Sequence, residues 1–152
     1  MTEVYLASYK GIRPGYHGIV NALIRYMDKS IYSHSEICIG NPFESEVECY
    51  SSSGVDKGVR MKRMKLSREN WDVLPLTTIT AEHVIQCFLE TKGEPYDYMG
   101  TGRFMLPMLL REHAFHWFCS EWAAWVAGYQ DAWRFSPAGL VALERSKGAE
   151  FI

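Results

Sequence analysis

Two short segments of the chain contain residue types that together could perform nucleophilic catalysis. FHWFCSEWAAWVAG (115–128) predicts a helix with Cys119 in its opening turn. The free N–H groups and the positive dipole end of a helix N-terminus favour a thiolate over a thiol. YSHSEICIG (32–40) predicts a short strand that carries His34. An imidazole close to such a thiol can take its proton, so the two segments predict a cysteine-nucleophile hydrolase or acyltransferase.

The order of these segments is the reverse of that in ordinary papain-like enzymes, because the His strand comes before the Cys helix. With VECYSSSGVDKGVRMK (47–62) and GEPYDY (93–98), they resemble the circularly permuted branch of the NlpC-type papain-like superfamily. That branch includes YiiX-like proteins and relatives of lecithin–retinol acyltransferase. The opening ASYKGIRPG (7–15) is similar to that of small phage- or prophage-encoded members. The resemblance implies an α+β, permuted papain-like fold, in which a small, mainly antiparallel sheet packs on the Cys-bearing helix.

The resemblance also implies a role for individual residues. Cys119 would be the nucleophile and His34 the general base. A third residue orients the imidazole and fixes its tautomer. The family places this residue on the strand after the His strand, where Glu48 fits best. Glu36 is the first alternative, because it lies two residues from His34 on the same strand face, and Ser52 is the second.

Tyr96 matches a further family motif, and its hydroxyl could donate to an oxyanion alongside the backbone N–H of Cys119. A packed aromatic ring is the competing interpretation of Tyr96. The implied reaction is cleavage of an amide bond through a thioester, with cell-wall peptide as the first expected substrate. A lipid acyl hydrolase or acyltransferase is the alternative activity, and a non-catalytic phage-associated binding module is the alternative without activity. No cofactor is expected.

Two other site chemistries are less well supported by the sequence. His113, His116 and Cys119 recur every three residues, which could hold Zn²⁺ on a helix, but aromatic neighbours crowd them. No fourth ligand has a recognisable spacing, so no metal is expected. The basic stripe from Lys57 to Arg68 alternates as a strand does and is offset by acids elsewhere. We interpret it as a solvated sheet face and expect no nucleic-acid partner.

Length and composition favour one domain spanning 1–152 without a strong charge bias. The 152 residues carry a net charge of −2, and no apolar run approaches the ~20 residues of a membrane span. No signal-peptide pattern is visible, so a cytoplasmic location is expected, with release or particle association if the gene is carried by a phage. The oligomeric state is open. Four cysteines without close pairing are interpreted as reduced, buried thiols.

Periodicity and capping signals predict the elements that position these residues. The segment RPGYHG (13–18) predicts a turn rich in Gly and Pro. The expected helices are 19–29, 80–90 with Thr80 as its cap, the Cys119 helix ending at Gly128, and 137–146 with Ser136 as its cap. The apolar stripe expected for the helix 80–90 is Val84, Ile85, Phe88 and Leu89. A further helix-like run covers 104–110. The expected strands are 4–9, 33–39, 46–52, 59–66 with a bulge or break inside it, and 72–76. Strands and helices that are segregated in this way favour α+β with an antiparallel sheet.

Overall fold

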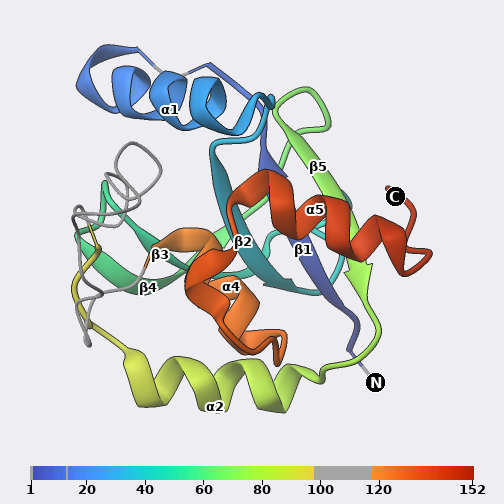
Figure 1. The fold of residues 1–152 in the computed structure, drawn as a ribbon. Coiled ribbons are helices and arrows are strands. Elements are labelled where there is room, and N and C mark those ends of the chain that lie inside the picture. The colour runs from blue at the N-terminus through green and yellow to red at the C-terminus, as the bar shows by residue number, and fades with distance from the viewer. Residues whose placement is uncertain (1, 13, 98–117) are drawn as a thin grey trace.

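The computed structural model describes residues 2–12, 14–97 and 118–152. In that part of the chain, one five-stranded sheet has the order β4-β3-β2-β1-β5, and every neighbouring pair is antiparallel (Figure 1). The strands are β1 (Val4–Tyr9), β2 (His34–Ile39), β3 (Val47–Ser53), β4 (Gly58–Met64) and β5 (Trp71–Leu76). The helices are α1 (Gly15–Asp28), α2 (Ala81–Thr91), α4 (Cys119–Val126) and α5 (Pro137–Ser146), with a short 3₁₀ turn η1 (Ala132–Arg134). The expected α+β class is confirmed.

The sheet has a separate apolar cluster on each of its faces. The larger cluster joins the sheet to α2, α4 and α5, which lie together on one side of it in Figure 1. Trp122 of α4 is completely buried in this cluster. The smaller cluster covers the other face and contains Tyr5, Ala7, Tyr9, Cys38, Val47, Cys49, Leu66, Trp71 and Val73. Because β1 lies between these clusters, all six of its residues are buried.

Local sequence signals explain where the helices begin and end. The Thr80 hydroxyl accepts a hydrogen bond from the His83 amide, and the Ser136 hydroxyl accepts one from Gly139, as expected for N-caps. Gly128, just after α4, has a φ of 84°, which is the left-handed conformation that ends many helices. No helix within the described ranges is long and apolar enough to cross a membrane.

Three expectations about the elements were wrong. Strand β4 has no bulge, because its register with β3 runs unbroken from Gly58 to Met64. Its apolar residues change face because Val59 packs in the helix-side cluster, whereas Met64 packs against the cluster on the other face. In α2, Ile85 and Leu89 are exposed, and Cys87 is buried in their place.

The third difference lies in α1, which begins at Gly15 instead of residue 19. Pro14 stands immediately before the helix, in an extended conformation. The Gly- and Pro-rich segment that predicted a turn therefore includes the first residues of a helix. The helix-like run 104–110 lies outside the described residues.

Candidate active site

Cys119 is the first residue of α4, and the rest of that helix is fixed in the core. The Trp122 indole donates to Thr91 Oγ1 of α2 at 2.9 Å, and Ser120 Oγ donates to the Phe135 carbonyl at 2.6 Å. Glu121 Oε2 accepts from the Phe118 amide at 3.3 Å, which caps the start of the helix. These bonds fix the Cys119 end of α4 relative to α2 and to Phe135. The predicted position of the cysteine at a helix N-terminus is therefore found.

His34, the first residue of β2, lies between Cys119 and an acidic side chain. Its imidazole is hydrogen-bonded to the Cys119 side chain, and its Nε2 lies 2.7 Å from Glu36 Oε1. With Nε2 engaged by the carboxylate, Nδ1 is the nitrogen left to face the sulfur. The Trp71 ring packs edge-on to the imidazole with 6.3 Å between ring centres. The arrangement brings a thiol, an imidazole and a carboxylate into one chain of contacts.

Glu36 is buried, with 1% of its surface exposed, and a guanidinium compensates its charge. Arg60 NH1 donates to Glu36 Oε2 at 2.7 Å, and Arg60 NH2 donates to Oε1 at 2.5 Å. Asp56 Oδ2 in turn accepts from Arg60 Nε at 2.9 Å. Such two-point contacts fix the plane of the carboxylate. Glu36 is therefore held in one orientation toward His34.

The sheet register explains how Arg60 reaches Glu36. Arg60 of β4 pairs with Ser51 of β3, and the β2–β3 register, continued by one step from Ile37–Tyr50, places Ser51 beside Glu36. The three side chains therefore form one row on the same face. Ser51 is small, and its hydroxyl bonds to the Ser35 carbonyl at 2.6 Å. The long Arg60 side chain can pass over it to the carboxylate.

The charges of the site shift two pKa values in opposite directions. Burial would lower the pKa of His34, but the Cys119 side chain and the Glu36 carboxylate outweigh it and raise this pKa to about 9. Burial would raise the pKa of Glu36, but hydrogen bonds from Arg60 and His34 lower this pKa to about 2. The site therefore favours a charged imidazolium beside an ionised carboxylate.

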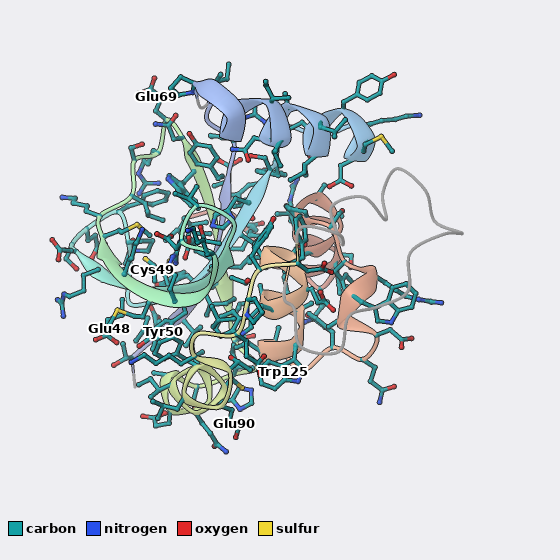
Figure 2. All side chains as sticks on the ribbon, turned by 90° about the vertical axis from the view of Figure 1, so that its left-hand side faces the viewer. Glu48, Cys49, Tyr50, Glu69, Glu90 and Trp125 are labelled. Carbon is teal, nitrogen blue, oxygen red and sulfur yellow. The ribbon has the colours of Figure 1, made fainter. Side chains whose placement is uncertain are left out.

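The predicted third member, Glu48, does not lie beside His34. Glu48 pairs with Ile39, five positions along β2 from His34, which is about 16 Å at the rise of a strand. Its carboxylate accepts from the Tyr50 hydroxyl at 2.6 Å, and Figure 2 shows both residues on the same part of β3. Ser52 faces away from the row that contains Ser51 and Glu36, because successive strand residues alternate. Glu36, the alternative, occupies the position next to the imidazole.

Tyr96 lies in the same small cluster as Cys119, with Phe118 and Ile24 of α1. Its ring centre is 5.8 Å from that of Phe118. The backbone of Gly54 lies so close to this ring that an added Cβ would come within 3.2 Å of it. Tyr96 is therefore a packed aromatic next to the thiol, and its role as an oxyanion donor stays a prediction.

Sequence reasoning placed Arg60 in a solvated basic stripe, which is wrong for this member of the stripe. The Arg60 side chain is 15% exposed and bonded to Glu36, whereas Lys62 is 48% exposed. The available signal was a charged residue that alternates with Val59 inside a strand, but its partner depends on register across three strands. His113 and His116 lie outside the described residues, and the described residues contain no cluster of three or more potential metal ligands.

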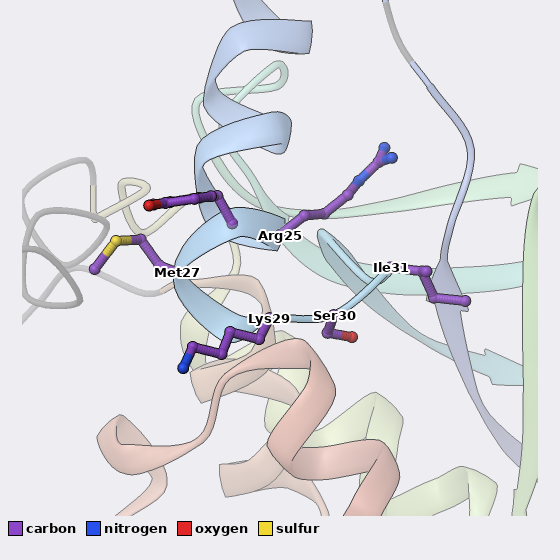
Figure 3. A pocket seen from close by; sticks show the side chains of 6 residues that line it. Arg25, Met27, Lys29, Ser30 and Ile31 are labelled. Atoms are coloured by element: carbon purple, nitrogen blue, oxygen red, sulfur yellow. The ribbon is translucent and has the colours of Figure 1, made fainter.

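An open pocket of about 670 Å³ lies at the C-terminal end of α1 (Figure 3). Its lining residues are Arg25, Tyr26, Met27, Lys29, Ser30 and Ile31. None of them is a thiol, an imidazole or a carboxylate. The pocket is thus not where the chemistry described above would occur.

The contact between the sulfur and the imidazole gives a direct spectroscopic prediction. Replacing Cys119 with alanine removes the first of the two side chains that raise the pKa of His34, so this pKa should fall below about 9. Ring-proton and ring-carbon shifts of His34, followed by NMR from pH 5 to 10, would measure the change. Cys87→Ala is the matched control and should leave the His34 titration unchanged. An unchanged His34 titration in Cys119→Ala would show that the thiol does not influence the imidazole.

No protein-family model matches this chain, and a search of curated proteins also finds no match.

Proposed function

We propose that this chain is a cysteine hydrolase with a permuted papain-like fold, which cleaves an amide bond through Cys119, His34 and Glu36. The observation that carries the proposal is the position of His34, whose imidazole contacts the Cys119 thiol on one side and the Glu36 carboxylate on the other. Thiol, imidazole and orienting acid are the three parts of this kind of catalyst. Arg60 keeps the acid ionised in a buried place.

The reaction would proceed in two halves. His34 takes the proton of Cys119, and the thiolate attacks the carbonyl carbon of the substrate to form a C–S bond. The tetrahedral oxyanion is stabilised by the backbone N–H of Cys119, with Tyr96 as a further candidate donor. The C–N bond then breaks, and the amine leaves with the proton from His34. Water, deprotonated by His34, attacks the thioester and releases the acid and the free thiol.

The proposed substrate classes follow from the bonds that a cysteine nucleophile can cleave and from the resemblance of the sequence motifs. A peptide amide, such as a cell-wall peptide, is the first candidate. A lipid acyl ester is the second, because the same thioester can form from an ester or pass its acyl group to another acceptor. Screening both classes with hydrolysis and acyl transfer as separate readouts would distinguish them. A protein without turnover in either screen, but with an intact fold, would match the binding-module alternative.

The first test is the pH dependence of iodoacetamide alkylation, read by mass spectrometry for each cysteine. Cys119 should react below about pH 7, ahead of Cys38, Cys49 and Cys87, because an imidazolium neighbour stabilises its thiolate. His34→Ala should abolish this lead. His83→Ala is the matched control, since His83 lies on α2 and bonds to the Val126 carbonyl at 2.9 Å.

The same experiment can refute the proposal. Cys119 is 1% exposed, so alkylation of the folded protein also reports whether an electrophile reaches the sulfur. A Cys119 that titrates like an ordinary thiol of pKa about 8.5 would show that no ion pair forms. If Cys119 reacts only after unfolding, it is inaccessible in the folded protein and cannot be the nucleophile.

A further inference from the structure

Cys38 and Cys49 lie directly opposite each other on β2 and β3. Their sulfur atoms are 3.2 Å apart, and both residues are completely buried. Directly opposed residues of antiparallel strands have Cα atoms roughly 4.5 to 5.5 Å apart. This separation lies within the range of about 4.4 to 6.8 Å that disulfides span. The sheet backbone therefore already holds this pair of thiols at a spacing suited to a disulfide.

The other two cysteines have different neighbours. Cys87 Sγ lies 3.5 Å from His83 Nε2 on the same helix, and Cys119 is bonded to His34. All four cysteines lie in the described part of the chain and are free thiols. Within this set, the close sulfur–sulfur contact belongs to Cys38 and Cys49, and the geometry selects one pairing.

We propose that Cys38 and Cys49 form an intramolecular disulfide when the protein folds in the presence of a small-molecule disulfide such as oxidised glutathione. One thiolate attacks the glutathione disulfide, forming a protein–glutathione disulfide and releasing one reduced glutathione. The second thiolate attacks the protein sulfur of that intermediate, forming the Cys38–Cys49 bond and releasing the second glutathione. The protein loses two hydrogen atoms, and glutathione is reduced.

Burial determines when this exchange takes place. The hydrogen bond to Cys49 and burial both raise the pKa of Cys38 well above its ordinary value, so the thiol stays protonated in the folded sheet. Thiol–disulfide exchange needs a thiolate that the oxidant can reach. The bond should therefore form during folding, or during local opening of β3 and the edge strand β4. Oxidant added to the folded protein should act slowly.

The disulfide would join β2, which carries His34 and Glu36, to β3, which carries Cys49 (Figure 2). A bond closing the short loop between the two strands restricts the unfolded chain. It should raise Tm by roughly 5 to 10 °C for a domain of this size. The sulfur of Cys119 takes no part and stays free for alkylation. The inference therefore does not rest on the proposed function.

The test is to refold reduced, denatured protein in a glutathione redox buffer, block free thiols with iodoacetamide and map the peptides. Before blocking, we expect an intact mass about 2 Da below that of the reduced protein. After blocking, we expect a cross-linked Cys38–Cys49 peptide, and the oxidised protein should have the higher Tm. Cys87→Ser, the matched control, should behave in the same way. Cys38→Ser should lose both the mass change and the Tm difference between oxidising and reducing buffer.

Two results would overturn the inference. One is complete alkylation of Cys38 and Cys49 after refolding in a buffer that oxidises a reference protein with a known disulfide. The other is a cross-link that includes Cys87 or Cys119. The test measures mass and melting temperature and does not depend on enzymatic activity. An inactive protein that forms the Cys38–Cys49 bond would therefore refute the proposed function but not this inference.

Discussion

Glu36→Gln should slow the alkylation of Cys119 near pH 6 by roughly 10- to 1000-fold, whereas Glu48→Gln should leave it unchanged. The charge of a neighbouring carboxylate shifts a pKa by about one to three units, and Glu36 is one of the two side chains that raise the pKa of His34. A glutamine keeps a similar shape and an acceptor oxygen but lacks the charge. The imidazolium–thiolate pair is then populated less.

Glu48 provides a matched control for this change. It is a glutamate in a strand of the same sheet, and its carboxylate accepts from Tyr50, which a glutamine oxygen can also do. The two variants make the same chemical change at two different positions of the sheet. Equal alkylation rates for folded Glu36→Gln and wild type would show that Glu36 is not the acid that orients His34.

Loss of fold is the main alternative explanation for a slow Glu36→Gln protein, because this variant leaves Arg60 buried without its main partner. Circular dichroism and thermal unfolding identify such a loss. The double variant Glu36→Gln/Arg60→Met separates the two effects further. Replacing both partners of a buried ion pair costs much less than removing one, so the double variant should regain stability while Cys119 stays slow to react.

Much of the fold could be predicted because it follows from local signals. Local sequence patterns predicted all five strands, and the caps Thr80 and Ser136 were found where the sequence suggested. The wrong expectations about α2 and β4 concern which side of the helix is buried and how the strand pairs with its neighbour. Ile85 and Leu89 have the spacing of a buried stripe but are exposed, whereas Val84 and Cys87 pack in the cluster that α2 shares with the sheet. Periodicity alone does not say which part of an apolar face meets the core.

Only the part of the candidate site that local sequence signals define could be predicted. The positions of Cys119 and His34 follow from one helix start and one strand. The choice between Glu36 and Glu48 required the distance along β2, and the role of Arg60 required the registers of two strand pairs together. Neither register is encoded near the residues concerned. Charge provided a partial signal, because an acid alternating with apolar residues in a buried strand needs a compensating cation.

Arg60→Met should lower the free energy of unfolding at pH 7 by about 3 to 5 kcal/mol, the cost of leaving one partner of a buried ion pair unpaired. Urea denaturation followed by circular dichroism measures this loss. Lys62→Met is the matched control. Lys62 also bonds to Asp56 but is 48% exposed, so its loss should cost less than about 1 kcal/mol. Equal losses in the two variants would contradict a specific role for Arg60.

The pH dependence of this loss has a sign that follows from the pKa of Glu36. With Arg60 present, this pKa is lowered from 4.5 to about 2, so its stabilising contribution is complete above pH 4.5 and disappears as the pH falls toward 2. Without Arg60, burial should raise the pKa of Glu36 above its ordinary value, and the variant should lose stability as the pH rises. The two proteins should therefore differ least near pH 2 and most above about pH 6. A difference that is constant across this range would mean that Arg60 stabilises the fold by packing, and that the charge of Glu36 is compensated elsewhere.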